Sequence, residues 1–214
     1  MASRLTGDWA KAEQRLKKME ELLKDNVAGA LKFSANDLER KMKSKIRKGD
    51  VGFEPLSPLT IARKGHAKPL RDSSSLMEAI KAHRFNRFKW GIGIPKGAKN
   101  KWGVELDLIA KVQEFGKIIR AKFAKYLAIP LTMEAMRLQH VFNGANNIPG
   151  LFKLKGRNVL AMKDGKALKI LFVLKDKVTI PARSFVRSTW NKEKRAVENR
   201  IKVAAEWAVM GRRY

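Results

Sequence analysis

The sequence predicts a single α+β domain with a long N-terminal helix, a small antiparallel sheet containing a β-hairpin, and a C-terminal helix packed on the sheet. Apolar residues recur every three or four positions near both ends of the chain. The middle instead holds short alternating stretches separated by Gly, Pro and Asp-Gly. Terminal helices with strands between them indicate the α+β class. The 214 residues, 44% hydrophobic, are enough for one core, so residues 1–214 are treated as one domain.

The first predicted element is a helical arm over residues 8–48. Its apolar stripe has helical spacing and comprises Leu16, Met19, Leu23, Val27, Leu31, Leu38, Met42 and Ile46. Two forms fit this stripe. The arm is either one long kinked helix or two helices in line, because Ser34 can cap a second helix with Phe33 stapled against Leu38.

The end of this arm is strongly basic. Its cations are Arg40, Lys41, Lys43, Lys45, Arg47 and Lys48. Cations are favoured near a helix C-terminus by the helix dipole, and the same cluster also suits a polyanion. The sequence leaves both interpretations open.

Residues 51–116 are predicted to form a loop, short helices and the first strand. Prolines keep residues 51–71 mostly irregular, with one turn of helix at 59–63. Asp72 or Ser73 then caps a short helix that runs to Ile80. Alternation over residues 84–94 predicts one half-buried strand. A basic turn at 96–101 precedes a helix that ends at Gly116.

The remaining chain is divided into an insertion, residues 117–157, and a closing segment, residues 158–214. Asp164-Gly165 supplies the positive backbone angles of a type I′ turn, which predicts a hairpin over residues 158–174. A further strand at 178–180 ends at Pro181. The final helix is expected to start after Ser188 or Thr189. Its inner side is expected to carry Trp190, Val197, Ile201, Ala204, Ala205 and Ala208.

The charge of the chain points to a partner. Lys and Arg number 47 against 20 Asp and Glu, a net charge of +27. A small soluble domain usually carries a net charge of magnitude about 2 to 8. Two partners can neutralise this excess: DNA or RNA, or acidic neighbouring subunits. The three basic clusters that could face them are 40–48, described above; Lys96, Lys99 and Lys101; and Lys153, Lys155 and Arg157.

No catalytic chemistry is visible in the sequence. The three histidines lie far apart and lack metal-ligand spacing, so no metal site is expected. The glycines at 91, 93 and 97 have the wrong spacing for a dinucleotide loop, and no P-loop occurs. The acidic residues are too scattered for a two-metal nuclease. We therefore expect no enzyme and no cofactor.

Aromatic and basic residues interleave over residues 84–90 (RFNRFKW). These aromatic rings could stack on single-stranded bases while the cations hold phosphates. An ordinary amphipathic strand has the same alternation, because it needs a buried aromatic face. The second interpretation is preferred from the sequence alone.

Three features that the sequence lacks indicate where the protein is located in the cell. The chain has no cysteine, which fits folding in a reducing cytoplasm. Its first residues lack the apolar stretch of a signal peptide, and no run of about 18 apolar residues suits a membrane span. We expect neither export by a signal peptide nor a membrane association.

Three segments resemble phage virion morphogenesis proteins, the tail-completion and neck proteins of the Mu-like and P2-like families with the HK97 tail-completion fold. Residues 54–65 (EPLSPLTIARKG), followed by 68–72 (KPLRD), resemble the family's P-L-S-P loop. Residues 109–116 (IAKVQEFG) are similar to its helix end, and residues 180–186 (IPARSFV) to its signature before the last helix. The residues of these segments expected to be structural are Pro55, Pro58, Gly65, Pro181, Arg183 and Phe185.

The resemblance implies a structural virion protein of a tailed phage, a tail terminator or head-tail joining protein without catalytic residues. It implies that copies assemble into a ring, usually a hexamer, beside other neck, connector and tail proteins. Genome DNA would pass through that ring without sequence-specific contact. The protein would wait in the host cytoplasm before assembly and then lie in the virion neck. The alternative is a free basic nucleic-acid-binding protein.

Overall fold

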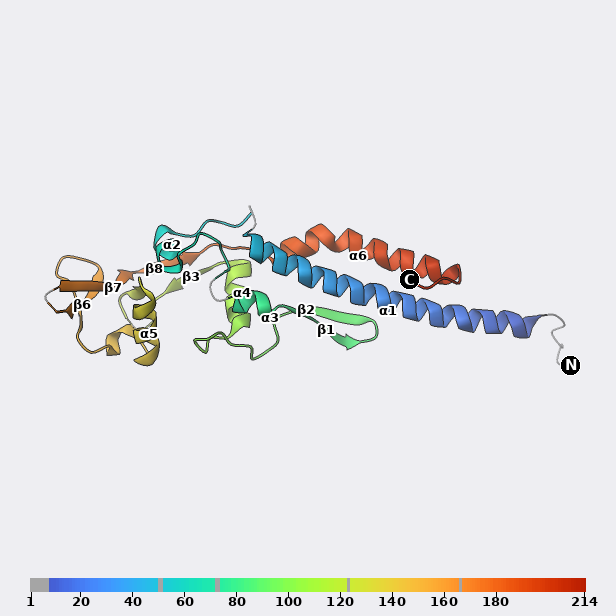
Figure 1. Ribbon diagram of the computed structural model, residues 1–214, viewed down its shortest axis with the longest axis horizontal. Coiled ribbons are helices and arrows are strands. Elements are labelled where there is room, and N and C mark those ends of the chain that lie inside the picture. Colours follow the sequence, from blue (N-terminus) through green and yellow to red (C-terminus); the bar gives the residue numbers. More distant parts are fainter. Residues whose placement is uncertain (1–7, 50–51, 72–73, 123, 166) are drawn as a thin grey trace. The chain divides into compact units, whose positions relative to one another are not determined.

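The computed structural model describes residues 8–49, 52–71, 74–122, 124–165 and 167–214. Its helices and small antiparallel sheets confirm the α+β class (Figure 1). The contacts divide the chain into two compact units that interleave along the sequence. Unit 1 comprises Met1–Lys45, Glu78–Pro95 and Phe185–Tyr214, and unit 2 comprises Ile46–Met77 and Lys96–Ser184.

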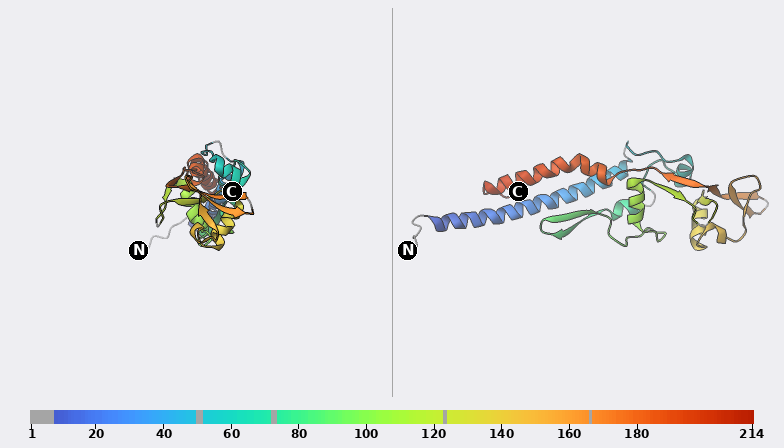
Figure 2. Two further views of the ribbon diagram at one scale, coloured as in Figure 1. Left: turned by 90° about the vertical axis from the view of Figure 1, so that its left-hand side faces the viewer. Right: turned by 180° about the vertical axis from the view of Figure 1, so that it is seen from behind.

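Unit 1 is built on two long helices, α1 (Trp9–Lys48) and α6 (Val186–Val209), whose last and first turns lie at the unit's boundary. Figure 1 and the right-hand view of Figure 2 show α6 beside α1. The Asn26 amide donates to the carbonyls of Ala204 and Arg212 at 3.1 and 2.9 Å. Lys45 reaches Ser188 at the other end of α6, at 2.7 Å. The two helices are therefore antiparallel.

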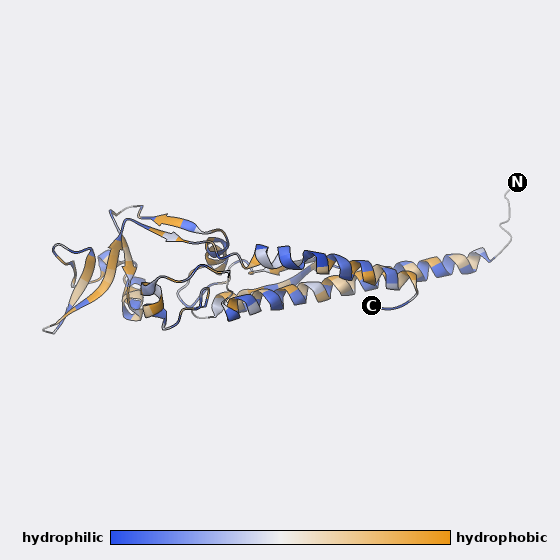
Figure 3. Ribbon diagram, turned by 90° about the horizontal axis from the view of Figure 1, so that it is seen from above, coloured by the Kyte–Doolittle hydropathy of each residue, from blue (hydrophilic) through white to orange (hydrophobic). Residues whose placement is uncertain are grey.

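The seam between the helices holds small and apolar side chains. Apolar and polar residues alternate along both helices, as expected where one face is covered (Figure 3). The buried residues are Ala30, Ala35, Leu38 and Met42 of α1 and Val197, Ala204 and Ala208 of α6. Of these residues, Leu38 and Met42 of α1 and all three α6 residues are ones that the periodicity predicts.

The structure decides between the two forms expected for the N-terminal arm. Residues 9–48 form one helix, and Ser34 is buried inside it rather than capping a second one. The expected staple of Phe33 against Leu38 is wrong, because the Phe33 ring is 54% exposed. That ring instead lies 5.1 Å from the guanidinium of Arg200 on α6. The first turns of α1, residues 9–18, are exposed throughout.

The final helix begins earlier than expected. Thr189 does not cap it, because the Thr189 hydroxyl donates to the Phe185 carbonyl four residues before, at 2.6 Å, as it does inside a helix. The helix therefore starts at Val186. Placing Trp190 on the inner side is also wrong, since this residue is 46% exposed.

The strand expected over residues 84–94 is instead a hairpin, and this is a correction. Strands β1 (Lys81–Asn86) and β2 (Lys89–Gly93) pair antiparallel. The Asn86 side chain accepts from the Phe88 amide at 2.9 Å and so closes the turn. A Glu39 carboxylate on α1 accepts from the amide of Ala82, which ties the hairpin to that helix.

Unit 2 carries the remaining elements. Its helices are α2 (Pro58–Lys64), α4 (Leu106–Phe115), α5 (Met133–Val141) and the 3-10 turn η1 (Ala145–Asn147), while α3 (Ser75–Ala79) crosses into unit 1. Its strands are β3 (Lys117–Arg120), β4 (Leu127–Pro130), β5 (Leu151–Lys153), β6 (Val159–Asp164), β7 (Ala167–Lys175) and β8 (Lys177–Ile180). The expected caps Asp72 and Ser73 of the helix before Ile80 lie outside the described residues.

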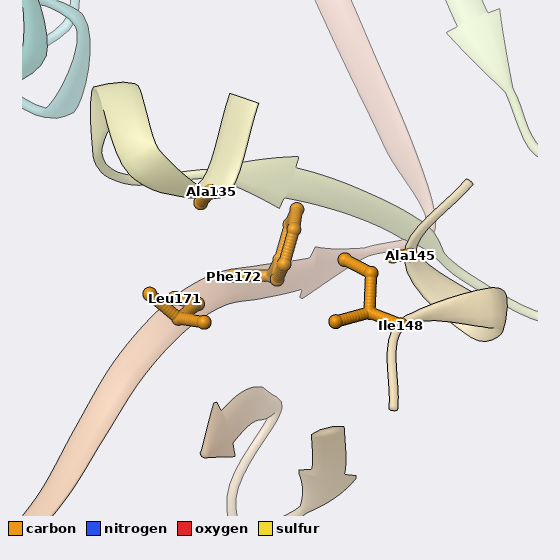
Figure 4. Packing of buried hydrophobic residues seen from close by; sticks show 5 residues of the cluster. All are labelled: Ala135, Ala145, Ile148, Leu171 and Phe172. Carbon is orange, nitrogen blue, oxygen red and sulfur yellow. The ribbon is translucent and has the colours of Figure 1, made fainter. Parts of the chain in front are cut away.

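The strands of unit 2 form two sheets. Strand β3 pairs with β8, and a separate four-stranded sheet has the order β4-β7-β6-β5. Strands β4 and β5 come from the expected insertion, so the hairpin β6-β7 shares a sheet with it. A core of Ala135, Ala145, Ile148, Leu171 and Phe172 lies against this sheet (Figure 4).

The hairpin β6-β7 is confirmed, but its turn lies one residue later than expected. Asp164 pairs with Ala167, so Asp164 belongs to strand β6 and precedes the turn. Gly165 has the positive φ, 61°. Lys166 lies outside the described residues, and the type I′ assignment with Asp164 as its first loop residue is wrong.

Candidate functional site

Arg183 joins the three segments that resemble the phage family. Its guanidinium donates to the carbonyls of Glu54 and Pro55, at 2.9 and 3.2 Å, and to the side chain of Gln113, at 3.2 Å. Its backbone amide donates to the Gln113 carbonyl at 2.6 Å. The side chain is only 6% exposed. We call Arg183 with Glu54, Pro55 and Gln113 the Arg183 junction.

The junction is closed by a backbone contact that only glycine allows. Gly116, the residue after α4, has φ 72°, and a Cβ there would lie 2.9 Å from the Ala182 nitrogen and 3.0 Å from the Ile180 oxygen. Next to it, the Ser184 hydroxyl donates to the buried Glu114 carboxylate at 2.5 Å. The end of α4 and the segment after β8 are therefore held together by backbone and side chains alike.

The first resembling segment contains a fully capped short helix. Ser57 is the N-cap of α2, with its hydroxyl accepting from the Thr60 amide at 3.4 Å, and Pro58 occupies the first turn, where no amide donor is needed. Gly65 ends the helix in the left-handed conformation, φ 73°, and its amide donates to Ile61. Pro58 and Gly65 thus lie at the two ends of α2, and the predicted helical turn is confirmed.

Electrostatics favour a structural role for Arg183. Burial lowers the pKa of its guanidinium, and the nearby charge of Glu54 partly offsets this effect. An arginine remains charged under such a shift. Its N–H groups donate to two backbone carbonyls and to the side-chain oxygen of Gln113. These bonds hold the loop before α2 against the end of α4.

A small cavity adjoins the junction. It has a volume of about 230 Å³, and its lining includes Leu56, Thr60, Arg63, Gln113 and Arg183. Within the described chain, the residues around it include no acidic, histidine or cysteine side chain. The cavity is therefore lined by cationic, uncharged polar and apolar side chains.

The structure also places the first predicted basic cluster. Arg40 and Lys41 bind the Asp37 carboxylate at 2.6 and 3.1 Å, together with Arg200 of α6 at 2.8 Å. Lys41 additionally pairs with Glu193, and Lys43 with Glu39. We call Asp37 with its three cations the Asp37 cluster. Much of the positive charge at this end of α1 is thus neutralised inside unit 1, while Arg47 and Lys48 are exposed.

The Asp37 cluster makes stability depend on pH. Burial would raise the pKa of Asp37, but hydrogen bonds from Arg40, Lys41 and Arg200 outweigh it and lower the pKa from 3.8 to about 2. A carboxylate with a lowered pKa stabilises the fold above its unfolded-state pKa, and this contribution is lost as the pH falls through the folded-state value.

We therefore expect the free energy of unfolding to fall by about 2 kcal/mol more in the wild type than in Asp37→Asn between pH 5 and pH 2. Urea unfolding followed by circular dichroism at several pH values measures this difference. Parallel pH profiles for both proteins would show that Asp37 has an ordinary pKa.

The other two predicted basic clusters lie on unit 2 surfaces. Lys96, Lys99 and Lys101 are exposed on the loop before α4, where the Asn100 side chain accepts from the amides of Trp102 and Val104. Lys153, Lys155 and Arg157 are exposed around β5, and Lys153 lies 5.2 Å from the ring of Tyr126. Each cluster is presented on its own loop or strand end.

The described residues contain neither a cluster of potential metal ligands nor a membrane-spanning helix. In that part of the chain, no three His, Cys, Asp or Glu side chains come close enough together to hold a metal ion. No helix among those residues is long and apolar enough to cross a membrane. Comparison with family models, curated proteins and solved structures gives no match for this chain.

Sequence reasoning missed two features of the molecule. The Asp37 cluster joins α1 to α6 across more than 160 positions, and a lone buried Asp on the apolar side of a predicted helix was its only signal. The hairpin β1-β2 was missed because its turn contains no Gly or Pro.

Proposed function

We propose that this protein is a structural subunit of a tailed-phage neck, a tail terminator or head-tail joining protein that closes into a ring. The Arg183 junction carries the proposal. The three segments that resemble the phage family lie far apart in sequence, yet they meet at one buried arginine. Among the resembling residues, Pro58 and Gly65 lie at the two ends of a helix and Arg183 donates hydrogen bonds to the other two segments, which suits a family defined by its fold and not by a reaction.

Exposed apolar residues support assembly with other subunits. In unit 2 they include Ile118, Val141 and Leu168, and in unit 1 Trp9, Val209 and Met210. Large apolar side chains left in contact with water mark protein-protein contacts when they gather in patches. In a ring, each copy presents two different surfaces to its neighbours, and the proposal assigns these residues to such contacts.

The exposed basic clusters suit the surroundings of a neck. Lys96, Lys99 and Lys101 on one loop and Lys153, Lys155 and Arg157 on another can face the passing genome or acidic neck, connector and tail proteins. Contacts to DNA would be made to phosphates and would carry no sequence preference. The proposed location is the virion, after synthesis in the host cytoplasm.

Assembly is the test of this proposal. We expect the purified protein at high concentration, or the protein in virions, to form closed rings, with six copies as the expected number. Native mass spectrometry and electron microscopy of particles measure the copy number and the position. A protein that stays monomeric at every concentration and is absent from the necks of particles would contradict the proposal.

A free nucleic-acid-binding protein is the second candidate, favoured by the net charge of +27. This candidate predicts tight, salt-sensitive DNA binding by a monomer. Ring formation or copurification with tails would instead favour the neck protein.

A further inference from the structure

The β1-β2 hairpin presents aromatic side chains to solvent. The Phe85 ring is 63% exposed and the Phe88 ring 48% exposed. An amphipathic strand would bury one aromatic face, which was the reason to read these residues as ordinary strand residues. Because Phe85 and Phe88 are exposed, burial of an aromatic face does not explain their presence in the hairpin. The half-buried face of the hairpin is formed instead by Ala82, Trp90 and Ile92.

The exposed face of the hairpin carries the rings of His83 and Phe85, which we call the aromatic platform. Phe85 sits at a shift of register between Arg84 and Asn86. Its ring leans over Gly91, where a Cβ would lie 2.6 Å from the ring and 2.9 Å from the His83 imidazole. The His83 and Phe85 rings touch edge to face, with centroids 4.8 Å apart. Glycine at position 91 therefore leaves room for both rings.

The charge around the platform is positive. Residues 81–93 contain five Lys, Arg or His residues and no Asp or Glu. Lys89 lies 5.7 Å from the centre of the Phe85 ring. Of the remaining cations, Arg87 is paired with Asp25 of α1 at 2.6 Å, while Lys81 and Arg84 are exposed. The acidic neighbour on the other side, Glu39, is itself paired with Lys43.

We propose that the β1-β2 hairpin binds single-stranded nucleic acid, with a base stacked on Phe85 and a neighbouring phosphate held by Lys89. Aromatic rings that stack on bases, combined with cations along the backbone, are the usual means of binding single strands without sequence preference. Three observations favour this binding. The Phe85 ring is exposed, Gly91 leaves room beside it, and residues 81–93 contain no Asp or Glu. The activity goes beyond a ring subunit, in which DNA only passes through.

A second copy of the hairpin is a less suitable occupant. The hairpin has unpaired strand edges that could extend a sheet, but two such hairpins would bring their basic side chains together. Nucleic acid instead supplies phosphates that can pair with the cations, and flat bases that can stack on the exposed Phe85 ring. Ring formation and hairpin binding can fail independently, so the two proposals are tested separately.

The test uses the full chain, Phe85→Ala, and a matched control, Phe33→Ala. Phe33 is also an exposed phenylalanine near a cation in unit 1, but it lies on α1. Binding of a fluorescent oligo-dT of about 15 nucleotides is followed by anisotropy at several salt concentrations. We expect Phe85→Ala to weaken binding roughly 5- to 100-fold, and Phe33→Ala to bind within about twofold of wild type.

A second pair of variants tests the phosphate contact. Lys89→Gln should reduce the slope of log affinity against log salt by about 0.7, the value for one phosphate contact to a single strand. Lys202→Gln, which removes a charge from the exposed side of α6, should leave the slope unchanged. Circular dichroism should give the same melting curve for all four variants, since each changed side chain is exposed.

Several outcomes would overturn the proposal. Equal affinity of Phe85→Ala and Phe33→Ala would show that net charge alone holds the oligonucleotide. Binding of a matched duplex at least as tight as the single strand would exclude base stacking. Loss of oligomer formation in Phe85→Ala, with oligonucleotide affinity unchanged, would assign the platform to a protein contact.

Discussion

Phe185→Ala should lower the free energy of unfolding by about 3 to 5 kcal/mol. The Phe185 side chain is 1% exposed and is among the largest fully buried side chains that the structure describes. Its truncation removes buried apolar area and leaves a cavity that the start of α6 cannot fill without moving. Urea unfolding monitored by circular dichroism measures the change.

Phe33→Ala is the matched control, because its ring is more than half exposed. We expect this variant to stay within about 0.5 kcal/mol of wild type. If Phe185→Ala and Phe33→Ala unfold at the same urea concentration, the Phe185 ring lies in solvent and is not the buried side chain described above.

Arg183→Met should cost about 3 to 4 kcal/mol of the free energy of unfolding. Methionine preserves much of the side-chain volume but donates no hydrogen bond. The carbonyls of Glu54 and Pro55 and the Gln113 side chain would then lose their donor in a buried setting. Urea unfolding measures the loss, and limited proteolysis should reveal faster cleavage in the loop before α2.

Two further variants separate charge from geometry at this position. Arg183→Lys keeps the charge, but one ammonium cannot reach all three acceptors on the two other segments, so we expect an intermediate loss of stability. Arg195→Met removes a cation from an exposed position of α6 and should be neutral. A full recovery in Arg183→Lys would mean that charge alone, and not the fork of donors, stabilises the junction.

Local chemistry explains which elements the sequence predicted. Ser57, Pro58 and Gly65 specify the start and end of α2 within eight residues, and Gly116 likewise ends α4. The hairpin β6-β7 was predicted from an Asp-Gly pair that needs no distant partner. In each case the residues that decide the structure are neighbours in the chain.

The hairpin β1-β2 shows why alternation alone can mislead. Arg84 pairs with Trp90 and Ala82 with Ile92, so even-numbered residues share one face on both strands. A two-residue turn alone pairs even with odd positions, as it does for Asn86 and Lys89. The register shift between Arg84 and Asn86 restores equal parity, so one strand or two strands give the same alternating pattern here. Only the Asn86 side chain, which accepts from the Phe88 amide, marked the reversal.

The Arg183 junction could not be predicted for a different reason. Its acceptors lie at positions 54, 55 and 113, and no periodicity or spacing in the sequence connects them with position 183. The resemblance picked out the segments separately, but it gave no contact between them. Which buried donor meets which acceptor depends on tertiary packing.

The pairing of β3 with β8 bears on how the segment between these two strands could be inserted or removed during evolution. Arg120 and Lys177 are the last partners of this ladder, so the polypeptide leaves and returns at neighbouring points. The residues between them hold β4 to β7, α5 and a core of their own. A two-residue turn can join antiparallel partners. Such a lobe can be gained, lost or exchanged between lineages as one genetic cassette, while the segments on either side keep their shape.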